Sequence, residues 1–189
     1  MKRIGVLGNI GAGKTYVAKS FGLPVFDADK EVAKLYRTDE KIFKKLKKAL
    51  PKYIYSFPID KNEITKAILE KNYNLKKIIK IVHFEIRKKM SSFLKKNKDK
   101  KFIILDIPLL LENKINKKDD ILIFVQSQKS KILSNLKKRK NFNKKLLKKF
   151  KEIQLPLNYK KKKSHFIIKN NFTKKSIKDG IKDILKEIK

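Results

Sequence analysis

The chain has 189 residues, no cysteine and a formal net charge of +34 at pH 7. Without cysteine it has no disulfides and no thiolate metal sites, and no apolar run approaches the roughly 20 residues of a membrane-spanning helix. The length is enough for one domain with a sizeable core. With no charged-then-apolar leader, the sequence predicts a cytoplasmic protein without a membrane partner.

The positive charge by itself suggests binding to nucleic acid or to an anionic membrane surface. However, only four of the 52 basic residues are arginine, whose planar guanidinium is the usual reader of phosphates and bases. The lysines are spread along the whole chain, a pattern typical of AT-rich coding bias on solvated faces. We therefore predict no specific nucleic-acid partner, and we interpret the lysine runs at 44–48 and 160–163 as solvated.

Residues 8–15, Gly-Asn-Ile-Gly-Ala-Gly-Lys-Thr, fit the phosphate-binding loop pattern of Gly, four residues, Gly, Lys and Ser or Thr. Residues 3–7 predict a short buried strand before the loop, and residues 16–21 a helix after it. Glycines let successive N–H groups converge on phosphate oxygens at the start of that helix. The residues expected to bind the nucleotide are Gly8, Asn9, Ile10, Gly11, Ala12, Gly13, Lys14, Thr15 and Tyr16.

Two residues of this loop carry specific chemical expectations. Lys14 is expected to reach the outer phosphates as a catalytic residue, and the Thr15 hydroxyl to bind Mg²⁺. The pattern therefore predicts ATP and Mg²⁺ as the cofactors.

A second apolar run, residues 24–26, ends at Asp27-Ala28-Asp29. It predicts a strand that delivers two carboxylates to its C-terminal end, where ligands bind in an open α/β sheet. Asp27 and Asp29 share one side of an extended chain unless a helix starts between them. One of them is then an N-cap. The alternative role is a general base that accepts a proton from a substrate hydroxyl.

Two helical stretches follow, at residues 30–50 and at about 61–98, the second interrupted near 72–74. The second stretch carries His83 and Arg87 on one face. A lone histidine is more often structural than catalytic. With Arg87 one turn further on, contact with a substrate anion is the competing interpretation.

Residues 102–105 form the clearest buried strand, and it ends at Asp106. The next residues, 107–112, are expected to form a loop because Pro108 has no N–H to donate to a sheet. An acidic residue at the end of a buried strand beside a phosphate loop commonly serves Mg²⁺, directly or through water. Asp106 is therefore a second candidate for the metal site.

The remaining predicted elements are a strand at 121–125, a helix at 129–138, an exposed turn at 139–143, a helix at 144–153, a strand at 166–168 and a helix at 176–189. Arg139 lies on the turn, where a phosphoryl-transfer enzyme would keep a lid arginine. The competing interpretation is one more solvated charge.

Residues 116–119, Asn-Lys-Lys-Asp, match the guanine-reading motif of GTPases. That motif should follow a buried strand, whereas here it precedes one. Residues 106–109 also lack the glycine that a GTPase switch needs. We therefore reject a GTPase function.

Strands that alternate with helices predict a doubly wound, parallel, five-stranded α/β sheet of the P-loop kinase type, with a helical substrate-binding insert and a lid. We predict a single domain over residues 1–189. Its expected parts are a core at 1–50, 101–138 and 164–189, a substrate-binding region at about 51–100 and a lid at about 139–160.

In these motifs the sequence resembles the dephospho-coenzyme A kinase family nearly from end to end. The stretches that carry the resemblance are residues 8–15, 25–29 with 35–36, 81–83 with Arg87, 105–112, Arg139, 154–156 with Lys160, and 166–168 with Asn170. The phosphate loop is shared by many families, but the Asp-Ala-Asp and Asp-Ile-Pro-Leu-Leu blocks in this order are specific.

The resemblance implies that ATP phosphorylates the ribose 3′-hydroxyl of dephospho-coenzyme A, the last step of coenzyme A synthesis. It implies that Asp29 is the catalytic base and that Arg139 is a catalytic lid residue. The substrate-binding residues that it implies are Asp29, His83, Arg87, Asp106, Pro108 and Leu109. We expect a monomer or a weak homo-oligomer.

Two other functions stay open on the sequence alone. One is a kinase of another small molecule or nucleotide on the same scaffold. The other is a nucleic-acid-binding ATPase, which the charge suggests but the scarcity of arginine and of stacking aromatic motifs disfavours.

Overall fold

The computed structural model describes residues 1–139 and 142–188. Most of the predicted turn at 139–143 and all but the last residue of the predicted C-terminal helix fall within these ranges. Residues 140, 141 and 189 lie outside them.

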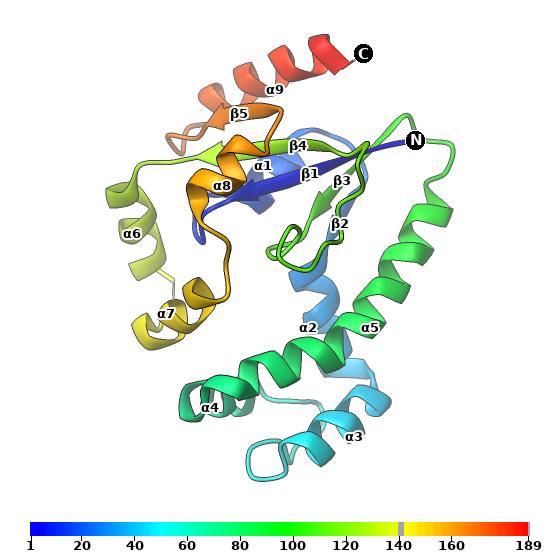
Figure 1. Cartoon of the computed structure of the whole chain (residues 1–189), viewed down its shortest axis with the longest axis vertical. Coiled ribbons are helices and arrows are strands. Elements are labelled where there is room, and N and C mark those ends of the chain that lie inside the picture. The colour runs from blue at the N-terminus through cyan, green and yellow to red at the C-terminus, as the bar shows by residue number, and fades with distance from the viewer. Residues whose placement is uncertain (140–141, 189) are drawn as a thin grey trace. The chain divides into compact units, whose positions relative to one another are not determined.

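The described residues contain one five-stranded sheet (Figure 1). Its strands are β1 (Lys2–Gly8), β2 (Val25–Asp27), β3 (Phe102–Asp106), β4 (Ile121–Gln126) and β5 (Phe166–Lys169). They lie in the order β2-β3-β1-β4-β5, and every neighbouring pair is parallel. The predicted α/β class and the five parallel strands are confirmed. After β1 the chain places strands on one side and then on the other, so the loop after β1 lies at the switch point where α/β sheets bind ligands.

The helices of the described residues are α1 (Lys14–Ser20), α2 (Ala28–Thr38), α3 (Glu40–Ala49), α4 (Lys61–Glu70), α5 (Asn72–Lys96), α6 (Lys129–Lys137), α7 (Lys144–Glu152), α8 (Leu157–Lys162) and α9 (Lys174–Ile188). The predicted helical stretch at 30–50 is two helices. Asp39 separates them, and its carboxylate accepts a hydrogen bond from the Ile42 N–H at 3.0 Å, which caps α3. The helix α8 was not predicted.

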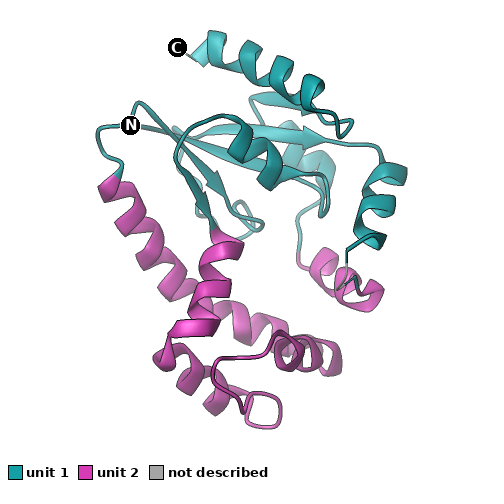
Figure 2. Ribbon diagram, turned by 180° about the vertical axis from the view of Figure 1, so that it is seen from behind, with its two compact units in different colours: residues 1–27, 97–142, 154–189 teal, residues 28–96, 143–153 magenta. Residues whose placement is uncertain are grey.

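The central strands of the sheet consist largely of apolar residues, and both faces of these strands are covered. All five residues of β3 are buried, as are six of the seven in β1. Helices α1 and α8 lie on opposite faces of the sheet, and α9 packs on β5 beside α1 (Figures 1 and 2). This coverage explains the continuous apolar runs from which the strands were predicted.

The chain divides into two compact units, coloured separately in Figure 2. Unit 1 comprises residues 1–27, 97–142 and 154–189, and holds the sheet. Unit 2 comprises residues 28–96 and 143–153, and is helical. Residues 28–50 thus belong to the helical unit, although the sequence suggested that they belong to the core. The prediction of a single domain stays a prediction.

Arg3 and Asp120 form a buried ion pair in unit 1. Arg3 donates to the Asp120 carboxylate through Nε at 2.7 Å and through Nη2 at 2.5 Å. The Lys117 N–H also donates to Asp120, at 2.9 Å. The stretch that matched the guanine-reading motif therefore lies directly before β4, as predicted, where it forms a turn around this ion pair.

His165 joins the start of β5 to β4. Its backbone N–H donates to the Leu122 carbonyl at 2.8 Å, and its ring Nδ1 accepts from the Leu122 backbone N–H at 3.0 Å. We expect His165→Ala to lower the free energy of unfolding by about 0.5–1.5 kcal/mol, because the Leu122 N–H loses its acceptor. His165→Asn offers a carbonyl oxygen in its place and should retain most of the stability. Urea unfolding of both variants measures the difference, and equal losses would contradict this role.

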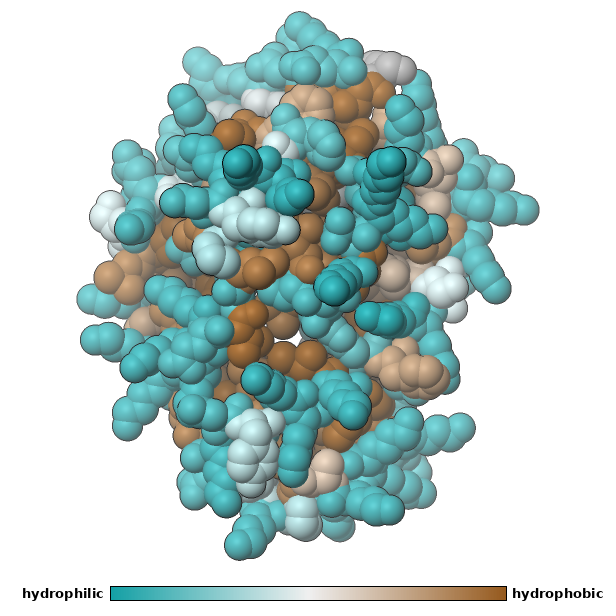
Figure 3. Space-filling model, in the orientation of Figure 1, coloured by the Kyte–Doolittle hydropathy of each residue, from teal (hydrophilic) through white to brown (hydrophobic). Residues whose placement is uncertain are grey.

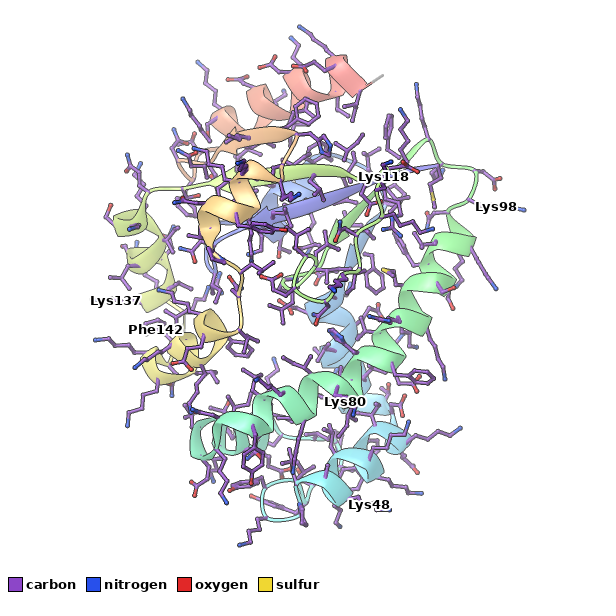
Figure 4. The ribbon with its side chains drawn as sticks, viewed as in Figure 1. Lys48, Lys80, Lys98, Lys118, Lys137 and Phe142 are labelled. Carbon is purple, nitrogen blue, oxygen red and sulfur yellow. The ribbon has the colours of Figure 1, made fainter. Side chains whose placement is uncertain are left out.

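Lysines cover much of the surface. On the face drawn in Figure 3, hydrophilic side chains surround smaller apolar areas. Lys48, Lys80, Lys98, Lys118 and Lys137, labelled in Figure 4, are all exposed. Within the described ranges, no helix is long and apolar enough to cross a membrane. The exposed positions fit the interpretation of the lysines as solvated charges.

Candidate active site

The phosphate loop connects β1 to α1, as predicted, and two of its glycines are structurally required. Gly8 has φ +144°, and a Cβ atom there would lie 2.7 Å from the Val125 carbonyl oxygen of the neighbouring strand. Gly13 has φ +86° and directly precedes α1. Side chains other than hydrogen are strained at both positions. The loop therefore turns tightly at the carboxyl end of the strands, where ligands are expected.

Lys14 and Thr15 begin α1. The Lys14 ammonium donates to the Asn9 carbonyl at 2.9 Å and to the Gly8 carbonyl at 3.3 Å, so the side chain lies back along the loop. Thr15 is exposed. A lysine so placed can exchange these carbonyls for phosphate oxygens.

Asp106 ends β3 beside the loop. Its side chain is buried and hydrogen-bonds to the Thr15 side chain. Burial raises the pKa of Asp106 above its ordinary value, and the negative charge of Asp27 adds to the rise. The Thr15 hydrogen bond and the charge of Lys14 act in the opposite direction. The structure thus brings together both residues predicted for Mg²⁺.

The raised pKa of Asp106 predicts a pH dependence of stability. The folded state holds the proton of Asp106 more tightly than the unfolded state does. Protonated Asp106 therefore favours the folded state at low pH. This contribution to the free energy of unfolding is lost from about pH 4 upward, as the pH passes through the folded-state pKa. We therefore expect Asp106→Asn to gain stability relative to the natural protein as the pH rises. Urea unfolding of both proteins at several pH values tests this. A difference independent of pH would contradict it.

Asp27 is a residue whose position the sequence left ambiguous. It is in register with Asp106 on the neighbouring strand, and Lys19 lies 3.5 Å from its carboxylate. The sequence showed an acid at the end of each strand, but not that β2 and β3 are neighbours. Strand order was the missing information, and it places Asp27 next to Asp106 at this end of the sheet.

Asp29 belongs to the helical unit. Because α2 begins at Ala28, Asp29 lies in the first helical turn rather than before it, and it is exposed. The interpretation as an N-cap therefore does not hold for Asp29. An acid in a first turn stabilises the helix through the helix dipole, and this offers a structural role for Asp29. The role of Asp29 as the catalytic base stays a prediction.

His83 and Arg87 lie one turn apart on α5, as predicted. Burial lowers the pKa of His83 below its ordinary value, and the positive charge of Arg87 lowers it further. His83 is therefore mainly neutral near pH 7 and can hydrogen-bond to a ligand. The charge for an anion contact comes from Arg87, which is exposed.

The remaining predicted site residues lie in unit 1. Pro108 and Leu109 are half-buried in the turns that follow Asp106. Arg139 is exposed and lies two residues beyond the end of α6, and its backbone N–H donates to the Leu136 carbonyl at 3.1 Å. The roles of all three stay predictions.

A cavity of about 380 Å³ opens beside the phosphate loop in unit 1. Its size lies in the range of small-molecule sites. The residues that line it come from the ends of β4 and β5 and from the start of α9: Gln126, Ser127, Gln128, Lys169, Asn170, Asn171 and Ser176.

Lys160 corrects one prediction. The lysine run at 160–163 was expected to be solvated, but the Lys160 side chain is 1% exposed and its ammonium lies 2.6 Å from Glu112 Oε1. That oxygen also accepts from the Leu155 N–H at 3.0 Å. Among the described residues, Glu112 Oε2 is the buried side-chain oxygen or nitrogen without a hydrogen-bond partner. The pair joins α8 to the loop after β3, and only the fold brings the two residues together.

Comparison with known proteins decides the family. The family model described as dephospho-CoA kinase matches residues 2–176, which is most of the chain. The chain belongs to the dephospho-CoA kinase family. The predicted resemblance is thereby confirmed.

Individual relatives agree with this assignment. A dephospho-CoA kinase from Wolbachia sp. subsp. Brugia malayi (strain TRS) is 34% identical over 187 residues, which cover 96% of this chain and 95% of the relative. A dephospho-CoA kinase from Agrobacterium fabrum (strain C58) is 28% identical over 194 residues, which cover 98% of this chain and 97% of the relative. The similarity extends over both compact units.

A solved structure supports the fold. The protein TT1252 from Thermus thermophilus superposes with a TM-score of 0.79 at 22% identity, covering 100% of this chain and 98% of that one. The family model thus assigns residues 2–176 to the dephospho-CoA kinase family, and the solved structure shows the same fold over the full length of the chain. The individual site residues stay predictions from geometry and motif.

Proposed function

We propose that the protein transfers the γ-phosphoryl group of ATP to the ribose 3′-hydroxyl of dephospho-coenzyme A, giving coenzyme A and ADP. The observation that carries the proposal is the match of the dephospho-CoA kinase model to residues 2–176. The phosphate loop after β1 supplies the matching chemistry, because its amides and Lys14 can hold the phosphates of ATP.

The residues near Thr15 suit Mg²⁺. Magnesium prefers hard oxygen ligands and usually takes one or two carboxylates together with phosphates and waters. Thr15 and Asp106 offer a hydroxyl and a carboxylate already in contact, and Asp27 adds a second carboxylate beside Asp106. When bound, the metal would neutralise charge on the β- and γ-phosphates. Among the described residues, no group of three or more His, Cys, Asp or Glu side chains could hold a metal ion.

The acceptor side would be served by the helical unit. Asp29 would orient the attacking hydroxyl and accept its proton. Arg87 would supply positive charge to an anionic group of dephospho-coenzyme A, with neutral His83 as a hydrogen-bonding neighbour. Arg139 would close over the transferring group as part of the lid.

The cavity of about 380 Å³ is our candidate site for the adenine base of ATP. It adjoins the phosphate loop through Ser127 and Asn170, both of which hydrogen-bond to Ala12. A base held there would leave the phosphates at the loop.

A coupled ADP-release assay with ATP and Mg²⁺ tests the proposal. The acceptors compared are dephospho-coenzyme A, adenosine and AMP, with buffer alone as the blank. Selective turnover with dephospho-coenzyme A is expected. Activity with a different acceptor would instead favour another small-molecule kinase, and stimulation by RNA would favour a nucleic-acid-dependent ATPase. Location in the cytoplasm, the absence of a specific nucleic-acid partner, and a monomeric or weakly associating state stay predictions.

A further inference from the structure

Two side chains converge on one carbonyl of the phosphate loop. Ser127 Oγ donates to the Ala12 carbonyl oxygen at 3.0 Å, and Asn170 Nδ2 donates to the same oxygen at 2.8 Å. Ser127 follows β4 and Asn170 follows β5. Ala12 and Asn170 are both buried. Two neighbouring strands therefore each end in a donor to the same point of the loop.

The orientation of Asn170 is itself fixed. Its Oδ1 accepts from the Phe172 N–H at 2.7 Å, and its backbone N–H donates to the Gln126 carbonyl at 2.8 Å. With Oδ1 committed as an acceptor, Nδ2 is the end of the amide that faces Ala12. A Cβ atom at residue 13 would collide with Nδ2, so Gly13 also makes room for this contact.

The held carbonyl determines the direction of a neighbouring N–H. The Ala12 carbonyl and the Gly13 N–H belong to one peptide group, which is planar and trans, so the two bonds point in opposite directions. Donors that fix the carbonyl on one side thus fix the Gly13 N–H on the other side. In a phosphate loop, such N–H groups are the ones that contact phosphate oxygens.

We propose that Ser127 and Asn170 are positioning residues that hold the Gly13 N–H in the orientation that phosphate binding requires. We call these two side chains and the Ala12 carbonyl the loop anchor. The proposal rests on the phosphate-binding role of the loop given above. The loop anchor acts before any ligand arrives, so the loop need not reorganise when phosphate binds.

The first test uses inorganic tripolyphosphate, which carries a phosphate chain without base or sugar, and calorimetry with the full chain. Ser127→Ala should weaken tripolyphosphate binding by about 2- to 5-fold, as expected for one lost hydrogen bond. Ser127→Thr keeps the hydroxyl and should bind as the natural protein does. Ser91→Ala removes an exposed hydroxyl from α5, and should also leave tripolyphosphate binding unchanged.

The second test uses both donors. Either donor alone still restrains the carbonyl in part, so the Ser127→Ala, Asn170→Ser double variant should lose more affinity for tripolyphosphate than the product of the two single losses. Losses that simply multiply, or a Ser127→Ala variant that binds tripolyphosphate like the natural protein, would overturn the proposal. Failure of the chain to phosphorylate dephospho-coenzyme A would refute the proposed reaction while leaving this measurement of phosphate binding valid.

Discussion

Replacing Asp29 with asparagine should lower turnover by about 10²–10⁴-fold, the usual contribution of a positioned general base. Asparagine has nearly the same shape but cannot accept the proton of the attacking hydroxyl. ATP should bind with nearly unchanged affinity, because the residues expected to bind its phosphates, 8–15, do not include Asp29. Single-turnover rates with dephospho-coenzyme A, together with calorimetric titration of ATP, measure both quantities.

Glu31→Gln is the matched control for Asp29. Both acids lie in the first turn of α2, where a negative charge stabilises the helix. Glu31→Gln should therefore reproduce the small loss of helix stability without the loss of turnover. If Asp29→Asn also keeps its turnover, Asp29 stabilises the helix and is not the base.

Replacing Lys14 with methionine should lower turnover by about 10²–10³-fold, the range found when one preorganised donor to a developing negative charge is removed. The Lys14 ammonium donates to the Asn9 carbonyl of the loop at 2.9 Å, and the loop pattern predicts that it reaches the outer phosphates when ATP binds. Methionine keeps the length and apolar stem of the side chain but removes the charge. Steady-state kinetics with ATP varied measure turnover and apparent affinity together.

Lys178→Met is the control for Lys14, because Lys178 is exposed on α9 and its loss changes the net charge by the same amount. It should leave turnover within about twofold, since exposed charges are well screened. An equal effect of both substitutions would mean that the general positive charge matters, and not the position of Lys14 in the loop.

The parts of the structure that sequence predicted best are those encoded by neighbouring residues. The strand, loop and helix around Gly8 to Thr15 follow from glycine spacing and an apolar run, and the structure has them in that order. The strand ending at Asp106 was equally clear, because both faces of a parallel sheet are covered and the run is continuously apolar.

The features that the sequence did not predict depend on residues far apart in the chain. Lys160 lies in a run of lysines, and its burial becomes evident only when Glu112 is placed beside it. Asp27 was predicted at the ligand-binding end of its strand, but its position beside Asp106 became evident only from the strand order. The break at Asp39 within an otherwise continuous amphipathic pattern was missed because the pattern resumes on α3 after a single capping residue.

The product of the reaction tests the central claim most directly. After incubation of the protein with ATP, Mg²⁺ and dephospho-coenzyme A, the product would be isolated and examined by mass spectrometry and phosphorus NMR. We predict a mass gain of one phosphate, with the new phosphomonoester on the ribose 3′-oxygen. Unmodified dephospho-coenzyme A after ATP has been consumed, or a phosphate at any other position, would contradict the assignment.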